Sequence, residues 1–268
     1  MSTMTAEQTA EALVLREDGE DGVTTLTLNR PEARNALSIG LMSSLQAALD
    51  DIAADAAVKV VVIAGAGPGF CAGHDLKEIR SDPSRETYQD LFTQCSRLMI
   101  TITRLPKPVI AKVHGIATAA GCQLVSTCDL AVAASDARFA TPGVNIGLFC
   151  STPMVALSRV VGRKAAMEML LTGDMVDAET ARSNGLVNRV VPPEELDAAV
   201  SALASQIAGK SPVSLAIGKE AFYRQLEMPL DDAYVYTAQV MTENMLKRDA
   251  EEGIDAFLEK RKPVWRGE

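Results

Sequence analysis

Residues 114–145 read H-G-I-A-T-A-A-G-C-Q-L-V-S-T-C-D-L-A-V-A-A-S-D-A-R-F-A-T-P-G-V-N, and this pattern decides the fold. It predicts a turn of small residues, then a short apolar helix, a strand and a proline-glycine turn. Small residues at the start of a helix let a ligand approach the backbone, and the free amides there can bind developing negative charge. We therefore expect any chemistry of this chain to take place here.

A second turn of the same kind lies upstream. The apolar run at residues 58–64 is typical of a strand covered on both faces, and it leads into G-A-G-P-G-F-C-A-G-H-D-L at residues 65–76. Two such turns side by side would aim two backbone amides at one point, where they would stabilise charge developing on a carbonyl oxygen. For one turn alone we favour the alternative, in which small residues only permit a strand to pack against a helix.

The remaining sequence alternates strand and helix signals as far as Pro192. The predicted elements are a hairpin at 11–28, a helix at 38–51 with Ser38 as its N-cap, a polar helix at 84–104, a strand at 109–113, helices at 152–161, 163–171 and 177–184, and a strand at 186–191. From residue 193 to residue 258 the pattern is helical almost throughout. We therefore expect an α/β core over residues 1–191 and a helical region over residues 192–268.

The composition is that of a globular protein with an acidic surface. The 268 residues are 47% hydrophobic and carry a formal net charge of -9, which argues against a partner that is a nucleic acid or an anionic membrane. The five cysteines form no C-x-x-C pair and predict buried free thiols in a reducing compartment. With two histidines, neither a metal site nor a Ser-His-Asp triad is predicted. We expect a cytoplasmic protein without a membrane-spanning segment.

Two segments carry a family resemblance. F-C-A-G-H-D-L-K-E-I at residues 70–79 and V-H-G-I-A-T-A-A-G-C-Q-L-V-S-T-C-D-L-A-V-A at residues 113–133 resemble the two oxyanion-hole segments of the crotonase, or enoyl-CoA hydratase/isomerase, superfamily. Residues 29–37, 171–191 and 257–265 also match, so that the resemblance covers nearly the whole chain. It implies the crotonase (ClpP-like) fold, which is a spiral of β-β-α units followed by a helical oligomerisation region. It also implies an acyl-CoA thioester of fatty-acid metabolism as ligand, with no tightly bound cofactor and no metal.

The resemblance assigns the two oxyanion-hole amides to His74 and Ala120. A backbone donor does not depend on the side chain, so both residue types are compatible with that role. For the imidazole of His74 we favour a position away from the acyl group or beside the CoA, and a catalytic imidazole is the alternative. Asp75 suits the start of the next helix and is interpreted as structural.

Two positions depart from the family pattern. Gln123 and Gly143 stand where hydratases of the family have the glutamates that act on the water and on the α-carbon proton. A carboxamide does not take up a proton at neutral pH, and glycine has no side chain, so both general acid/base groups are missing. Each such group contributes about 100- to 10,000-fold. Cys150 is a candidate substitute nucleophile, for which we favour a buried thiol, and Asp129 is interpreted as structural.

The resemblance also implies the contacts to coenzyme A and the oligomeric state. The CoA-binding positions in this sequence are Arg30, His74, Asp75, Leu76 and Lys77, with Phe257 and Lys260 supplied by a neighbouring subunit. The family forms trimers that stack into hexamers, and we expect a homotrimer or homohexamer. The apolar stripe of the predicted helix at 230–246 fits either a subunit contact or the core of its own chain.

The activity is left open between two classes of protein. An oxyanion hole without the glutamates suits another acyl-CoA reaction that needs only enolate stabilisation, such as decarboxylation, or one in which the substrate supplies the base. A non-catalytic acyl-CoA-binding or regulatory protein is the alternative. Low or absent hydration of crotonyl-CoA is expected in either case.

Overall fold

The computed structural model describes residues 12–268, so Glu11, the first residue of the predicted hairpin, lies outside it. The main sheet has the strand order β1-β2-β3-β4-β6-β9, in which only β1 and β2 pair antiparallel. Its strands are β1 (Val14–Asp18), β2 (Val23–Leu28), β3 (Val60–Gly65), β4 (Val109–Val113), β6 (Leu130–Ala134) and β9 (Arg189–Val191).

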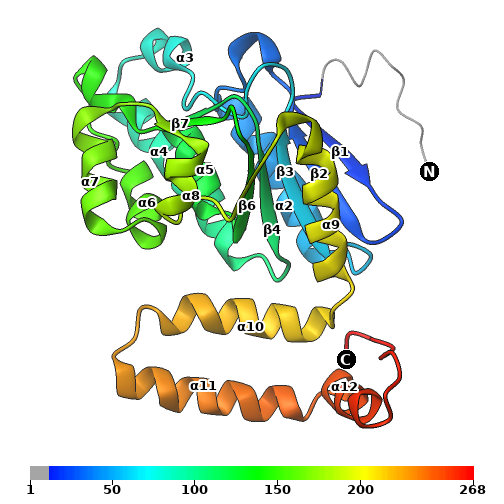
Figure 1. Cartoon of the computed structure of the whole chain (residues 1–268). Helices are drawn as coiled ribbons and strands as arrows, with labels where there is room; N and C mark the ends of the chain where they lie inside the picture. Colours follow the sequence, from blue (N-terminus) through cyan, green and yellow to red (C-terminus); the bar gives the residue numbers. More distant parts are fainter. Residues whose placement is uncertain (1–11) are drawn as a thin grey trace.

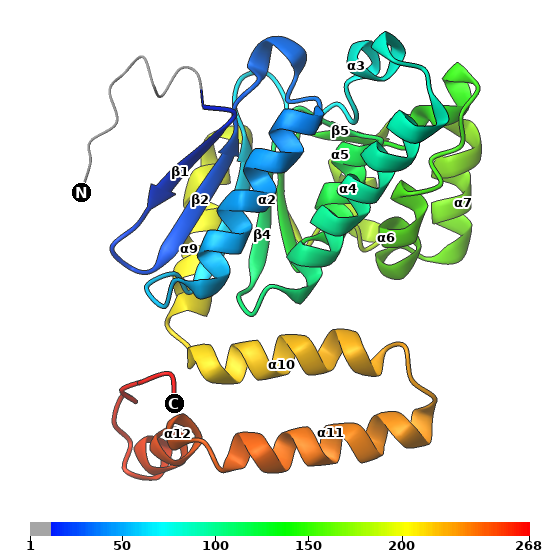
Figure 2. The same ribbon diagram turned by 180° about the vertical axis from the view of Figure 1, so that it is seen from behind.

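Helices cover both faces of this sheet (Figures 1 and 2). α2 (Ile39–Ala54) and α4 (Arg85–Arg104) lie on one face, and α9 (Leu196–Ala208) lies on the other. Along β3, Val61 and Ile63 join the larger core cluster, whereas Val60 and Val62 join the cluster around α9. The predicted strand with two covered faces is therefore confirmed, and the sheet core continues through α9, beyond the change of pattern near residue 192.

A small second sheet, which the sequence pattern did not predict, gives the chain its spiral form. β4 in the main sheet continues into β5 (Ile116–Thr118) and then α5 (Ala120–Thr127), and β6 likewise continues into β7 (Arg138–Ala140). β5 and β7 pair in parallel. These are the β-β-α units that the resemblance implies. The remaining elements of this part are α3 (Leu76–Ser81), α6 (Pro153–Val160), α7 (Arg163–Thr172), β8 (Val176–Asp177), α8 (Ala178–Ser183) and the short 3-10 helices η1 (Pro31–Ala33), η2 (Pro142–Ile146) and η3 (Pro193–Glu195).

The last three helices form an arm beside the sheets. α10 (Pro212–Gln225), α11 (Leu230–Met245) and α12 (Arg248–Leu258) make a separate layer below the body in Figures 1 and 2. The predicted C-terminal helical region thus contains four α-helices. The first, α9, packs on the main sheet, and the other three form the arm. None of the helices between residues 12 and 268 combines the length and the apolar character needed to span a bilayer.

A buried ion pair fixes the arm to the body. Lys219 of α10 donates to Asp129 over 2.7 Å and to the carbonyl oxygen of Ile102 over 3.0 Å. The hydroxyl of Tyr223 donates to the other Asp129 oxygen over 2.8 Å. Asp129 also accepts the amide of Val109 at 2.7 Å. Both oxygens of this carboxylate therefore take part in packing, which fits the structural interpretation of Asp129.

Candidate functional site

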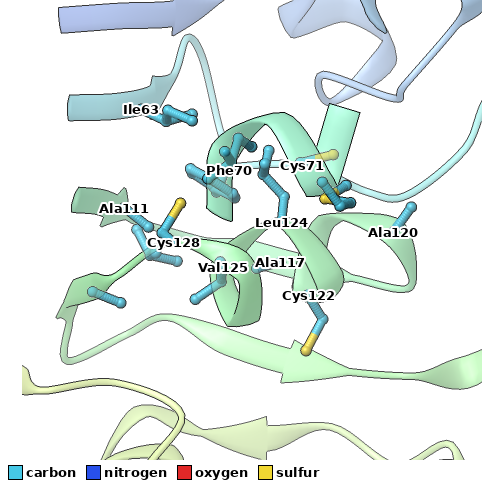
Figure 3. Close-up of a cluster of buried hydrophobic side chains, with 14 of the residues drawn as sticks. Ile63, Phe70, Cys71, Ala111, Ala117, Ala120, Cys122, Leu124, Val125 and Cys128 are labelled. Carbon is cyan, nitrogen blue, oxygen red and sulfur yellow. The ribbon is translucent and has the colours of Figure 1, made fainter. Parts of the chain in front are cut away.

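The two glycine-rich turns lie in direct contact. The amide of Cys71 donates to Ile116 over 3.0 Å, and the amide of Thr118 donates back to Cys71 over 2.9 Å. A Cβ atom added to Gly121 would lie 2.1 Å from the Cys71 carbonyl oxygen, so only glycine lets α5 pack this closely. Figure 3 shows Cys71 beside α5, with Ala120 at the end of that helix. The prediction that the two turns lie side by side is confirmed.

The amides of His74 and Ala120 are both left without an acceptor in the described chain. Leu37 and His74 form an isolated β-bridge. In it the Leu37 amide donates to the Gly73 carbonyl oxygen and the Asp75 amide donates to the Leu37 carbonyl oxygen, so the His74 amide takes no part. Ala120 is the first residue of α5, where an amide has no intrahelical acceptor. Among residues 12–268 neither amide donates to a protein group. A Cβ added to Gly73 would lie 3.4 Å from the Ala120 nitrogen, so the two turns adjoin at these residues.

Ala119, the residue of the second turn that precedes α5, has a strained backbone. Its φ of 50° and ψ of -118° are sparsely populated for a residue with a Cβ atom. The conformation is fixed by the Ala119 amide, which donates to Ala140 over 2.9 Å. The strained residue directly precedes Ala120, and strained residues of this kind cluster at binding and catalytic sites.

The imidazole of His74 packs against α4. Its Nδ1 lies 3.4 Å from the carbonyl oxygen of Leu37, and its ring meets the ring of Phe92 edge-on at 5.7 Å between centroids. Nε2 is buried and has no hydrogen-bond partner in the described chain. Burial lowers the pKa of His74, opposed by the hydrogen bond with Leu37, so the ring is neutral at pH 7.

Asp75 and Arg30 brace the first turn. Asp75 is the N-cap of α3 and accepts the amides of Lys77 at 3.1 Å and Glu78 at 3.3 Å, while its other oxygen accepts from Arg30 over 3.0 Å. Burial raises the pKa of Asp75, but the hydrogen bonds from Arg30 and the two amides outweigh it, so the pKa is lowered. These contacts fit the structural interpretation of Asp75. Leu76 and Lys77 are exposed at the start of α3.

Neither position of the missing glutamates holds a group that titrates near neutral pH. Gln123 is 4% exposed, and its Oε1 lies 3.9 Å from the Cys95 thiol, which donates to it. Gly143 is buried, and a Cβ atom there would lie 3.0 Å from both the Cys150 Sγ and the Leu148 carbonyl oxygen. The loop after η2 therefore fills the space that a side chain at position 143 would need.

Cys150 is a buried thiol, as the sequence interpretation favoured. It is 7% exposed, and burial raises its pKa, opposed by a hydrogen bond with the Gly143 backbone. All five cysteines are buried and free. A thiol with a raised pKa is a poor nucleophile at neutral pH, so this geometry does not favour Cys150 as a catalyst.

Phe257 and Lys260 lie far from the two turns of their own chain. Phe257 is 82% exposed near the end of α12, and Lys260 is exposed just beyond that helix. α12 lies at the foot of the arm, whereas α3 lies at the opposite end of the molecule in both views (Figures 1 and 2). The structure thus brings the turn at Gly73 and His74 against the start of α5 at Ala120, but it does not bring these two residues there. In the described part of the chain, no group of three or more His, Cys, Asp or Glu side chains is arranged to hold a metal ion.

Thr141 is a buried polar residue that the sequence interpretation did not single out. It precedes Pro142 and Gly143, and its side chain is fully buried. The hydroxyl has no hydrogen-bond partner among the described residues. Because Ala140 pairs with Thr118, Thr141 lies next to the strained turn that leads into α5. Nothing in the sequence distinguishes an unpaired hydroxyl from an ordinary threonine at the end of a strand.

We expect Thr141→Val to raise the free energy of unfolding by about 1 kcal/mol, because it removes a buried hydroxyl that has no partner. Thr118→Val is the matched control, since the Thr118 hydroxyl donates to Ala72 over 3.0 Å. That change leaves a half-buried carbonyl oxygen unpaired and should cost about 1–2 kcal/mol. Urea unfolding of the two variants measures both effects, and an equal loss in both would contradict the assignment of Thr141 as unpaired.

The comparison with known proteins decides the family. Residues 18–268 match the enoyl-CoA hydratase/isomerase family. The chain belongs to this family. Human enoyl-CoA hydratase domain-containing protein 3, mitochondrial, is 48% identical over 245 residues, which are 91% of this chain and 81% of that protein. The residue pattern A-G-H at 72–74, A-A-G-C-Q at 119–123 and F-C-S-T-P at 149–153 also resembles that group of relatives, and the comparison confirms this finer resemblance.

Solved structures of the family confirm the fold. The crystal structure of an enoyl-CoA hydratase from Mycobacterium smegmatis superposes with a TM-score of 0.94 at 56% identity, covering 95% of this chain and 99% of that one. The crystal structure of human enoyl-CoA hydratase domain-containing protein 3 superposes with a TM-score of 0.92 at 47% identity, covering 94% and 100%. The predicted crotonase fold is therefore confirmed, including the C-terminal helices.

Proposed function

We propose that this enoyl-CoA hydratase/isomerase family member binds acyl-CoA thioesters and stabilises negative charge on the thioester oxygen, without the usual hydratase mechanism. The observation that carries the proposal is the pair of unpaired amides, of His74 and Ala120, on two turns in contact. Donors that are already oriented stabilise an enolate without reorganising during the reaction, and such stabilisation is often the largest single contribution to catalysis.

The proposal departs from a hydratase because of Gln123 and Gly143. Each glutamate of the family would contribute about 100- to 10,000-fold as a general acid or base. The Gln123 amide accepts from Cys95 instead, and Gly143 is packed against Cys150 and the backbone of Leu148. Reactions of an enolate, such as loss of a carboxylate from the acyl group, need the oxyanion hole but not this pair of glutamates.

The start of α3 is the proposed surface for coenzyme A. Lys77 is an exposed cation next to His74, and Leu76 offers an exposed apolar side chain beside it. The ion pair between Arg30 and Asp75 holds this turn in place. A lysine near a phosphate acts as a point charge, which suits the phosphates of coenzyme A in an otherwise acidic protein.

We propose that the chain forms a homotrimer, which can pair into a hexamer. The arm leaves apolar side chains of α11 exposed, namely Tyr234, Val235, Met241 and Met245, which are 48–72% exposed. Such a face is stabilised when another subunit covers it. The neighbour's Phe257 and Lys260 then complete the coenzyme A site, since α12 lies at the opposite end of its own chain from α3. Sedimentation equilibrium tests this, and a monomer at micromolar concentration would overturn it.

A non-catalytic acyl-CoA-binding protein is the second candidate. The packing of Cys150 and Leu148 against Gly143 favours it, because the space of one catalytic group is closed by the protein itself. The cytoplasm, a reducing compartment, is the proposed location, supported by five buried free thiols. The names of the vertebrate relatives place those proteins in mitochondria.

The purified chain should bind crotonyl-CoA saturably and hydrate it slowly or not at all. The physical reason is that no carboxylate is present to act on the water or on the α-carbon proton. Calorimetry measures binding, and the absorbance of the enoyl thioester measures hydration. Turnover at a rate of about 10 per second, which is ordinary for enzymes, would refute the proposed loss of hydratase chemistry. Absence of binding would refute the proposed ligand.

A further inference from the structure

Asn35 is a fully buried polar residue whose side chain joins two loops. Its Nδ2 atom donates to the carbonyl oxygens of Ala66 over 2.8 Å and of Gly69 over 2.9 Å. Its Oδ1 atom accepts the amide of Arg30 at 2.9 Å. Both protons of the side-chain amide are therefore used. The loop that follows β2 is fixed in this way to the glycine-rich turn that follows β3.

The backbone at Asn35 restricts which side chain can make these bonds. Its φ of 54° lies in the left-handed region, and its own amide donates to the Arg30 carbonyl oxygen over 2.8 Å. Glycine, asparagine and aspartate enter this region more readily than other residues. Of these three, only asparagine carries a group that donates two hydrogen bonds. Asparagine therefore suits both the backbone and the turn that it holds.

The same loop fixes the peptide group that carries the His74 N–H. Leu37, two residues after Asn35, donates its amide to the Gly73 carbonyl oxygen over 2.7 Å and accepts the amide of Asp75 at 3.3 Å. The Gly73 carbonyl and the His74 N–H belong to one planar trans peptide group, in which the two bonds point in opposite directions. The bond from Leu37 therefore orients the His74 N–H, which is without an acceptor in the described part of the chain.

We propose that Asn35 is a positioning residue for the thioester oxygen, because its side chain holds the loop whose Leu37 amide orients the His74 N–H. This inference rests on the proposed binding of an acyl thioester by the amides of His74 and Ala120. The Ala120 amide belongs to the other turn, which is held by the pairing of β5 with β7. Loss of the Asn35 side chain therefore displaces one of the two donors and leaves the other in place.

The stretching frequency of the thioester carbonyl tests this role, because a hydrogen bond to the oxygen weakens the C=O bond and lowers the frequency. Butyryl-CoA with an isotope label at the carbonyl carbon is bound to the full chain at saturating concentration, and infrared difference spectra record the carbonyl band. We expect the wild type to lower the frequency and Asn35→Gly to lose most of this change. Glycine keeps the left-handed backbone but removes both side-chain donors. The affinity should fall by about tenfold, the equivalent of about one hydrogen bond.

The matched control is Asn188→Gly. Asn188 also joins two segments, since its Oδ1 accepts the amide of Ala131 at 2.8 Å, but it does so near the start of β6 and not at the turns. This variant should keep the wild-type carbonyl frequency. Asn35→Asp is the second variant if Asn35→Gly does not fold. Aspartate tolerates the same backbone but as a carboxylate donates no hydrogen bond, so it should lose the same change in frequency.

The outcomes separate the positioning role from the proposed function. A folded variant of Asn35 that binds butyryl-CoA with the wild-type carbonyl frequency overturns the positioning role and leaves the proposed function standing. An equal loss in Asn188→Gly also overturns that role, because a general loss of stability would then explain the effect. A wild-type chain that does not bind butyryl-CoA, or binds it without lowering the frequency, overturns the proposed function and the inference with it.

Discussion

Gly121→Ala should lower the free energy of unfolding by about 3 kcal/mol and weaken acyl-CoA binding at least tenfold. The added Cβ atom would lie 2.1 Å from the carbonyl oxygen of Cys71, which is backbone and cannot rotate away. Overpacking of a tight core typically costs about 1–3 kcal/mol, and this contact is at the upper end. Because Gly121 follows Ala120, relief of the clash must separate the two turns, and small displacements of positioning groups reduce binding and catalysis strongly.

The matched control for Gly121→Ala is Gly218→Ala in α10. Both glycines lie in helices, but a Cβ atom at Gly218 would meet nothing within 4 Å. Alanine is favoured over glycine in a helix interior by about 0.5–1 kcal/mol, so this variant should be more stable than the wild type. Denaturant unfolding and acyl-CoA titration of both variants make the comparison. If Gly121→Ala retained wild-type stability and affinity, the close contact between the turns would not be needed.

The fold and the contact between the two turns could be predicted because they depend on residue size and periodicity. The apolar run of β3 requires cover on both faces, and the small residues of the turns require a close approach. Ser38 and Ser84 mark the starts of α2 and α4, where each accepts an amide at 3.1 Å. The second sheet was missed, because β5 and β7 are three residues long and β8 is shorter still, too short for a periodic signal.

The remaining site features depend on contacts between distant segments, which a single sequence does not encode locally. The orientation of Gln123 toward Cys95 depends on how α4 packs on α5. The closing of the space beside Gly143 depends on the path of the loop to Cys150, where the Leu148 amide donates back to Gly143 over 2.9 Å. The unpaired Nε2 of His74 depends on the position of α4. The sequence identifies which groups are missing, whereas these contacts define the space at position 143 and the hydrogen-bonding groups that remain around it.

The loop to Cys150 determines how hydration can be restored. Gln123→Glu combined with Gly143→Glu supplies both carboxylates, but the glutamate at position 143 meets the Cys150 sulfur, which lies 3.0 Å from its Cβ position. We therefore expect little gain from the double variant. Adding Cys150→Ala removes the sulfur, so that the Leu148 carbonyl oxygen at 3.0 Å and the backbone nitrogen of residue 150 at 3.3 Å have to shift by only a few tenths of an ångström. The triple variant should hydrate crotonyl-CoA at least about 100-fold faster than the wild type.

The matched control keeps the shape of the triple variant and removes one charge, by combining Gln123→Glu, Gly143→Gln and Cys150→Ala. A carboxamide at position 143 fills the same space but cannot exchange a proton, so this variant should lack most of the gain. The absorbance of crotonyl-CoA at saturating concentration gives the rate of each variant, and calorimetry shows that each still binds the thioester. If the triple variant binds crotonyl-CoA but is no faster than this control, the carboxylates do not reach the double bond. In that case the acyl pocket itself, and not only its acid and base, differs from that of a hydratase.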